Sequence, residues 1–481
     1  MNYDGQKQAS PEQGGFMKKH LSVFLILTLL FLGQNSIVYA VGSSGFENAS
    51  YSAKTLGQAN AVVARPQDPS TISFNPAGIV ELPGVQLSAG LQNLDFRVSH
   101  RNAVTDDINQ NAGKLVLLPS FYLTANPGQL LDNRVAFGLA VNSPFGLSSK
   151  FPSIGMARFT GYKNSLRMVA TTMAGSVRMT DWMNIGGGAI NYWMYDYGQS
   201  FNYPNGSILT NNANPNAFPD GKAVTETNGF GWGWNLGVLL KPRPNHKVGV
   251  SYRSKADIKV NGRVLIDDLV NGVAQGYDTF PHFQSGAHSD VPLPWNLTLG
   301  YAYDPSPKWA VETDFGITGW DVFRDQDFGF DRPNATLRAL GTIPRDYERT
   351  FSFHLGGHRQ LNDKTDLFSG FAFYQAASPK KHVDNFLPDA NRFLWSMGTS
   401  YNLTKKARVD FAYMFMLFAS RHISNPGQLA KTGESIDGKY TSILHGAFVT
   451  FTYSFDFPFE KKRRAGAGSE ADIKPAEFLI K

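Results

Sequence analysis

The sequence predicts an all-β protein: a fourteen-stranded antiparallel transmembrane β-barrel with an N-terminal hatch, or plug, inside its lumen. Three observations predict this fold. The 481 residues are rich in strand and turn formers, with 36 Phe, 19 Tyr and 47 Gly, whereas charged residues make up only 17%, against roughly 25% in soluble domains. Runs of alternating apolar and polar residues recur along most of the chain. Short turns and long polar loops alternate between these runs, as in outer-membrane barrels, which have tight periplasmic turns and long external loops.

The start of the chain has the features of a secretory signal. A basic stretch, an apolar stretch and a small-residue cleavage site follow one another as Met17 to His20, Leu21 to Leu32, and Val38 to Ala40. The apolar stretch is too short to cross a bilayer as a helix, although a membrane anchor is the alternative. We therefore expect residues 1–40 to be a leader, with 17–40 as the signal peptide and either Met1 or Met17 as the true start.

Residues 41–83 follow the leader and differ from everything after them. This stretch is Gly-rich and broken, too small to be a domain and too long to be an idle linker, and its centre runs from Asp68 to Ala77. Later runs place small residues such as Gly231 and Gly233 at the inward positions, which leaves space in a lumen too wide for wall side chains to fill. We therefore expect residues 41–83 to form a hatch inside a barrel of residues 84–457.

Fourteen runs alternate with the period of a strand, and the clearest is Trp295 to Tyr303, where aromatic and aliphatic residues share one face. The expected strands are 84–99, 114–125, 133–142, 164–180, 183–203, 226–241, 246–264, 291–304, 307–323, 346–361, 364–378, 391–404, 406–421 and 440–457. We expect the apolar face to meet lipid and the polar or small face to line the lumen. The alternative is a large soluble β protein whose apolar faces pack sheet against sheet.

The connections between these runs sort by length. Short turns are expected at 126–132, 180–181, 242–245, 305–306, 362–363 and 404–405. Longer loops are expected near 100–113, 143–163, 204–225, 265–290, 324–345, 379–390 and 422–439. An even number of strands places both termini on the periplasmic side. Residues 458–481, with the basic cluster Lys461 to Arg464, are expected to be a disordered periplasmic tail.

Several classes of function find no support in the sequence. Cysteine is absent, which excludes disulfides, thiolate metal sites and Cys nucleophiles. The net charge of +6 is modest and no basic stripe is interleaved with stacking aromatics, so we expect no nucleic-acid binding. His354 near Ser352 and His445 near Ser442 come without an acidic partner or an oxyanion motif. We therefore expect no enzyme, no catalytic residues, no metal and no cofactor.

Seven short motifs, in order along the mature chain, carry a family resemblance. They are Ser44-Gly-Phe46, Asn75-Pro-Ala77, Ser143-Pro-Phe-Gly-Leu147, Leu293-Pro-Trp295, Pro307-Lys-Trp309, Pro388-Asp-Ala-Asn-Arg-Phe393 and the closing Phe451-Thr-Tyr-Ser-Phe455. Each alone is weak, but together and in this order the chain resembles the FadL-type outer-membrane transporters of long-chain fatty acids. That family also includes channels for aromatic hydrocarbons.

The resemblance implies passive uptake of hydrophobic molecules. In the family, a ligand is caught in an apolar groove among the external loops and moves to a lumenal pocket. A rearrangement of the hatch then opens a lateral exit at a kinked third strand. Long-chain fatty acids are the expected ligands, and each buried CH₂ contributes about 0.8 kcal/mol to such binding. Aromatic hydrocarbons by the same route are an alternative. A general diffusion porin and a structural or adhesin barrel acting through its loops are two others.

Four residues are candidates for the hatch and gate. We expect Asn75, Pro76 and Ala77 to form the hatch turn that touches the wall, because Pro fixes φ and Asn hydrogen-bonds its own backbone; a purely structural turn is the alternative. Gly138 is a candidate for the kink in the third strand, since Gly often marks a bend, although ordinary wall geometry also explains it.

Ligand-binding candidates come from two regions. Arg345 resembles in placement a basic residue that pairs with the ligand carboxylate in the family; the alternative is a rim charge paired with Asp346 or Glu348. The region 195–203, where a second basic partner is expected, lacks Lys and Arg, which puts specificity for a free acid in doubt. The loop after the third strand supplies apolar candidates for the outer groove, unless they only pack on one another: Phe145, Leu147, Phe151, Ile154, Met156 and Phe159.

These features together predict the protein's location and partners. We expect a monomer in the outer membrane of a Gram-negative bacterium. Its partners would be hydrophobic small molecules, outer-membrane lipid and lipopolysaccharide, and the barrel-assembly machinery, with no nucleic acid among them.

Overall fold

Every described strand of the computed structural model lies in the unit Val38–Lys481. The structure describes residues 44–48, 50–111, 116–203, 205, 219–269, 280–333, 337, 341–383, 389–424 and 436–455. The expected leader, residues 41–43 of the expected hatch and the expected tail 458–481 lie outside the described residues.

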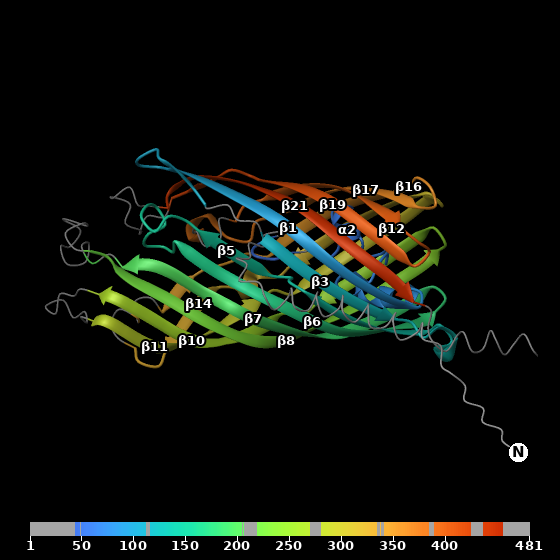
Figure 1. The fold of residues 1–481 in the computed structure, drawn as a ribbon, viewed down its shortest axis with the longest axis horizontal. Coiled ribbons are helices and arrows are strands. Elements are labelled where there is room, and N and C mark those ends of the chain that lie inside the picture. The colour runs from blue at the N-terminus through green and yellow to red at the C-terminus, as the bar shows by residue number, and fades with distance from the viewer. Residues whose placement is uncertain are drawn as a thin grey trace, which may run out of the picture. The chain divides into compact units, whose positions relative to one another are not determined.

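The fold is a closed barrel of fourteen antiparallel strands, as predicted (Figure 1). The wall strands are β1 (Val85–Asn102), β3 (Val116–Ala125), β4 (Val135–Asn142), β6 (Lys163–Thr180), β7 (Met183–Tyr203), β8 (Gly221–Arg243), β9 (His246–Arg253), β12 (Asn296–Ser306), β13 (Trp309–Thr318), β16 (Thr350–Gln360), β17 (Thr365–Tyr374), β18 (Arg392–Asn402), β19 (Ala407–Phe418) and β21 (Gly438–Phe455). Each pairs with the next, and β1 pairs with β21 from Val85 opposite Phe455 to Asn102 opposite Gly438. This last pairing leaves no free edge, which a sheet in lipid requires.

Seven further strands extend or cover the wall. They are β2 (Ile108–Gln110), β5 (Gly146–Lys150), β10 (Ala256–Leu269), β11 (Phe280–Leu293), β14 (Asp325–Phe330), β15 (Thr342–Pro344) and β20 (Arg421–Ile423). β10 follows β9 after two residues, β11 precedes β12 in the same way, and β10 pairs with β11 in continuous register over most of their length. Figure 1 shows β10, β11 and β14 together at one end of the barrel.

Six loops were therefore predicted too long. The regions expected as loops at 100–113, 143–163, 204–225, 265–290, 324–345 and 422–439 each contain strand residues. In β11, which lies mostly within the expected loop 265–290, the exposed positions carry polar residues, such as Gln284 and Asp290. An extension that stands beyond the lipid has no need of an apolar outer face, so its sequence looks like a loop.

The direction in which side chains face agrees with the prediction. On β12, Leu299 is 53% exposed whereas its neighbours Gly300 and Ala302 are buried. On β8, Trp232 is 66% exposed between the inward Gly231 and Gly233. Because exposed aromatic and aliphatic residues recur on the outside of strand after strand, the outer face of the wall is an apolar band suited to lipid.

The described helices are short. They are α2 (Ala53–Leu56), α3 (Thr71–Phe74) and the 3₁₀ turns η1 (Pro76–Glu81), η2 (Gly128–Leu131), η4 (Trp320–Val322) and η5 (Lys380–His382). Ser52 caps α2 through a capping box with Thr55, and Asn75 caps η1 by accepting a hydrogen bond from the backbone N–H of Ala77. No helix in the described part of the chain is long and apolar enough to cross a membrane.

Candidate functional site

Residues 44–48 and 50–82, here called the inner segment, are almost wholly buried within the sheet that closes around them. Its short helices and turns satisfy part of its backbone N–H and C=O groups, as in the hydrogen bond from Leu56 N to Ser52 O, and other groups need partners elsewhere. Wall side chains provide them: Tyr122 donates to Tyr51 O, Thr450 accepts from Ala53 N, Ser396 accepts from Ala59 N, Asn235 donates to Ile72 O, Ser176 donates to Ala77 O and Asn126 donates to Val80 O. The segment therefore touches strands on all sides of the barrel.

Small inward residues make room for the inner segment. At eight wall glycines on eight strands, an added Cβ would come within 3.3 Å of atoms of this segment: Gly138, Gly186, Gly237, Gly249, Gly300, Gly356, Gly370 and Gly398. At Gly186, Gly249 and Gly370 the nearest atom of the segment belongs to its backbone, so a side chain there would displace backbone rather than a flexible side-chain end. The inner segment thus packs against the wall positions where the alternating pattern predicted small, inward-facing residues.

Asn75, Pro76 and Ala77 lie where the inner segment meets β7 and β8. Asn75 Nδ2 donates to the carbonyl oxygens of Val63 at 2.8 Å and Val238 at 3.1 Å. An added Cβ on Gly186 would lie 2.4 Å from the carbonyl carbon of Pro76. The turn therefore fills a fitted space against the wall.

Gly138 lies in the third wall strand, β4, within an uninterrupted ladder: it pairs with Thr124 of β3 and Ala174 of β6 without a shift of register. An added Cβ would lie 2.7 Å from Ile72, so the glycine allows the inner segment to pack closely. Its pairing gives no sign of a kink at this residue. Between β4 and β5, at residues 143–145, the strand is interrupted instead.

Two buried acidic residues of β13 anchor the middle of the inner segment. Asp314 Oδ2 accepts hydrogen bonds from the backbone N–H groups of Val62 at 2.9 Å and Val63 at 3.2 Å. Glu312 Oε1 accepts one from Ala64 at 2.6 Å. Carboxylates on the wall therefore hold three successive backbone amides of the inner segment.

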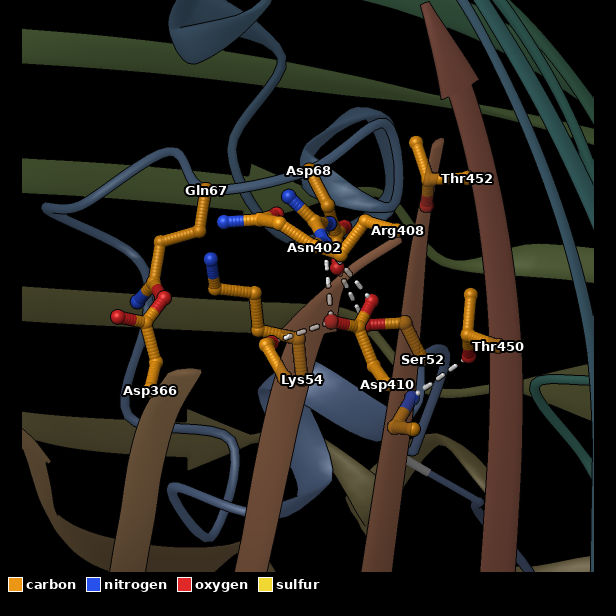
Figure 2. A network of polar contacts seen from close by, with 12 residues as sticks. Ser52, Lys54, Gln67, Asp68, Asp366, Asn402, Arg408, Asp410, Thr450 and Thr452 are labelled. Carbon is orange, nitrogen blue, oxygen red and sulfur yellow. Dashed lines mark hydrogen bonds and ion pairs between the residues drawn. The ribbon is translucent and has the colours of Figure 1, made fainter. Parts of the chain in front are cut away.

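A second polar cluster surrounds α2. Figure 2 shows Lys54 lying between Asp366 of β17 and Asp410 of β19. Asp410 is fully buried, receives a hydrogen bond from Ser400, and lies 2.9 Å from Arg408 Nε. Burial lowers the pKa of the Lys54 ammonium to about 8, with the charge of Arg408 acting in the same direction and Asp410 and Asp366 opposing it.

The start of the inner segment is held by an aromatic cage. The Phe46 ring is fully buried and packs edge-to-face against Trp320 at 4.7 Å, Phe323 at 5.8 Å and Phe145 at 6.0 Å between ring centres. Trp320 Nε1 donates to Ser44 Oγ at 3.0 Å. The motif that contains Phe46 is thus enclosed by residues far away in the chain.

The next residue, Glu47, forms an ion pair that the sequence did not reveal. Its carboxylate lies 2.5 Å from Arg253 Nη2, and the Arg253 guanidinium lies 4.9 Å from the centre of the Phe145 ring. Arg253 is the last residue of β9. It faces the same side of the strand as the buried Gly249 and Ser251, which is the inside of the barrel. The sequence could have indicated this ion pair only through an arginine at an inward position of a predicted strand.

A cavity of about 70 Å³ adjoins this ion pair. Its lining is largely polar and includes Glu47, Tyr51, Asn60, Arg253, Asp314 and His354. His354 Nε2 lies 3.1 Å from Ser352 Oγ, while its Nδ1 lies 2.8 Å from the backbone oxygen of Ala59. The Ser352 and His354 pair considered for catalysis is thus in contact, but its imidazole is oriented by a backbone carbonyl of the inner segment. No group of three or more metal-ligating side chains occurs among the described residues.

Arg345 lies apart from this cavity, directly after β15. It is buried, and its Nη2 donates to Gln326 Oε1 at 2.8 Å. Asp346, considered as its partner, instead lies 2.9 Å from Lys381 Nζ and 3.0 Å from His382 Nε2. The hydrogen bond and charge of Lys381 contribute most to lowering the pKa of Asp346, and His382 adds to the effect.

The six apolar groove candidates do not share one open surface. Phe145, Leu147, Phe151 and Met156 are buried, Ile154 is 77% exposed and Phe159 is half-buried beside the guanidinium of Arg158. An apolar cluster that the sequence did not indicate joins β7, β8, β10, β11 and β14 at the end of the barrel that these extensions form. Its members include Phe201, Tyr203, Val264, Ile266, Phe283 and Phe330. Most of these residues lie in or beside regions that the sequence predicted to be loops.

A closed barrel with an apolar outer band is typical of outer-membrane proteins, and here a segment of the same chain is buried inside the barrel. The match to known proteins agrees. Residues 36–455 match the family model described as outer membrane protein transport protein (OMPP1/FadL/TodX), and the chain belongs to this family of outer-membrane transporters for hydrophobic compounds. It is accordingly a multi-pass barrel of a Gram-negative outer membrane.

Named relatives cover nearly the whole chain. Outer membrane protein P1 of Haemophilus influenzae is 23% identical over 460 residues, which is 86% of this chain and 95% of that protein. The long-chain fatty acid transport protein of Escherichia coli O157:H7 is 24% identical over 455 residues, or 87% of this chain and 95% of that protein.

Solved structures share the fold. A Pseudomonas aeruginosa FadL homologue superposes with a TM-score of 0.73 at 18% identity, covering 86% of this chain and 100% of the other. The Pseudomonas putida toluene transporter TodX gives a TM-score of 0.63 at 16% identity, covering 86% and 100%.

Proposed function

We propose that this protein is a passive channel for the uptake of hydrophobic molecules, with long-chain fatty acids as its main ligands and the inner segment as its hatch. The filled lumen is the observation that carries this proposal. A segment that needs wall side chains for its backbone hydrogen bonds, and that leaves a cavity of only about 70 Å³ beside Arg253, is a poor conduit for water. A general diffusion porin would need the lumen to be open.

The expected route has three stages. The apolar cluster around Phe201 and Phe283, together with the exposed Ile154 and the half-buried Phe159, would capture the ligand outside. The polar cavity beside Arg253 would receive its head group. Movement of the hatch would then open a lateral exit, for which the interruption of pairing at residues 143–145 offers a place.

The names of relatives include both ligand classes. The E. coli relative is named a long-chain fatty acid transport protein, whereas structural relatives include toluene transporters. Arg345 is kept as a candidate for the carboxylate at the rim, where its guanidinium would have to exchange its contact with Gln326 for the ligand. Aromatic hydrocarbons taken up by the same route are the second candidate.

Two experiments test the proposal. Single-channel conductance of the intact protein is expected to be low and to rise strongly after deletion of residues 41–83, because the lumen then loses its filling. A high conductance of the intact protein would contradict the hatch. Binding of labelled oleate, compared with toluene, then distinguishes the two ligand classes, and binding of neither would favour an adhesin.

A further inference from the structure

Two adjacent residues of the inner segment present a ring and a carboxylate to two different sites. The Phe46 ring lies in the cage of Trp320 and Phe323, and the Glu47 carboxylate lies 2.5 Å from Arg253 Nη2. The Phe145 ring touches both sites, since it packs on Phe46 and lies 4.9 Å from the guanidinium carbon. Together the cage and the guanidinium form one continuous site for an apolar group joined to an anion.

The guanidinium has capacity for a further acceptor. Arg253 Nε is buried and makes no hydrogen bond within the described part of the chain. The hydrogen bond to Glu47 is donated by the other nitrogen on the same edge, Nη2. A carboxylate that approaches along the Nε and Nη2 edge would bind through two parallel hydrogen bonds, which is the favoured geometry for this pair. Asn60 Oδ1 and Asn235 Oδ1, which also line the cavity, are buried and accept no hydrogen bond among the described residues either. The site thus has unused polar capacity beside its charge.

The cavity is too small to take such a ligand as it stands. An apolar cavity of about 150 Å³ holds one benzene ring, and the space beside Arg253 is about 70 Å³. A ring with a carboxylate would therefore have to replace side chains of the inner segment rather than add to them. Phe46 and Glu47 are the groups with matching chemistry.

We propose that Phe46 and Glu47 are an internal substitute for the ligand, and that the site takes an arylalkyl carboxylic acid. The acid's carboxylate replaces Glu47 on Arg253 and its ring replaces Phe46 in the cage. Binding then releases residues 44–48 from the wall, and the backbone bridge between Glu47 and Phe145 breaks in the same step. This inference rests on the proposed function, since it adds a second class of acid to the long-chain fatty acids proposed for the same channel. It also provides the basic partner whose absence from residues 195–203 put recognition of an acid in doubt.

Binding of 4-phenylbutyrate and its uncharged analogue 4-phenylbutyramide to the purified full-length protein in detergent tests this assignment by calorimetry. We expect the acid to bind about tenfold or more tightly than the amide, which is the effect of one hydrogen-bonded charge. Glu47→Gln should tighten binding of both compounds about tenfold, because it weakens the internal competitor that each of them must displace. Arg253→Gln should reduce the affinity for the acid to that for the amide.

An exposed ion pair provides matched controls. Glu226 and Arg263 lie 2.9 Å apart with about half of each side chain exposed, so Glu226→Gln and Arg263→Gln change the net charge equally without touching the site. Heat-dependent mobility on gels verifies that each variant is folded. If Glu47→Gln behaves like Glu226→Gln, or if Arg253→Gln keeps the preference for the acid, the assignment is wrong.

A second measurement does not depend on these variants. The chain has no cysteine, so Ser44→Cys introduces a single thiol at the start of the inner segment. Its rate of labelling should rise with 4-phenylbutyrate and stay constant with the amide; equal rates would overturn the exchange. If oleate or toluene binds while 4-phenylbutyrate does not, only this inference fails. If none binds and deletion of residues 41–83 leaves the conductance unchanged, the proposed function fails with it.

Discussion

The start and the middle of the inner segment are held by different kinds of contact. Residues 44–47 are held by side chains, a ring in an aromatic cage and a carboxylate on an arginine, together with a short backbone bridge between Glu47 and Phe145. Residues 53–64 are held by their backbone amides, which donate to wall groups such as Thr450 and Asp314, and by the charges around Lys54.

This difference separates recognition from closure. A ligand can reproduce a ring and a carboxylate, but it cannot reproduce a series of backbone amides in fixed positions. We therefore expect changes in the middle to affect stability and conductance, and changes at the start to affect ligand preference. The following predictions test that division, from the largest expected effect to the smallest.

Loss of Asp410 should have the largest effect. Asp410→Leu leaves Arg408 and Lys54 buried without their main counter-charge, which should cost about 3–5 kcal/mol of stability and raise the conductance. Thermal unfolding in detergent measures the loss. The double variant Asp410→Leu with Lys54→Met should recover part of the lost stability, because one uncompensated cation has been removed. An equal loss of stability in the single and double variants would contradict a role for the Lys54 charge.

The Lys54 ammonium should make closure depend on pH. Its pKa is about 8 when docked and 10.5 when exposed, so the undocked state binds more protons between these values. Docking therefore strengthens as pH rises from about 8 to 10.5, by roughly 3 kcal/mol in total, and is constant below this window. Conductance should fall over this range in the natural protein, whereas Lys54→Met should lack this component. Parallel curves for the two proteins would exclude Lys54 as the cause.

Filling the space at Gly186 should disturb the turn at Pro76. Gly186→Ala places a methyl group 2.4 Å from backbone of the inner segment, whereas the methyl group of Gly357→Ala lies 3.8 Å from its nearest neighbour, Ser369 O. Overpacking of this kind costs about 1–3 kcal/mol, and we expect higher conductance and faster proteolysis near residue 76. The same response from Gly357→Ala would show that the clash is not responsible.

A change at the start should be the mildest for closure. Phe46→Leu loses edge-to-face contacts worth about 0.5–1.5 kcal/mol, so an acid ligand should bind about two- to tenfold more tightly because its internal competitor is weaker. Conductance should stay close to that of the natural protein. A rise as large as that of Gly186→Ala would mean that the start also closes the channel.

The sequence by itself determined the wall. Alternation of period two indicates which residues face outward whether or not the partner strands are known, and Leu299, Trp232 and their like face outward as expected. The number of strands and the order of short and long connections also follow from local patterns. The expected strand 246–264 ran through β9 and most of β10, whereas most of β11 was missed because beyond the lipid its outward positions are polar, and the pattern that marks a membrane strand disappears.

The contacts that hold the inner segment could not be predicted from the sequence. Glu47 and Arg253 are 206 residues apart in the chain, and Ser44 and Trp320 are 276 apart. Whether such residues meet depends on the registers of many intervening strands and on the path of the inner segment, which no local pattern encodes. An inward arginine is visible in the sequence, but its partner appears only when the barrel closes.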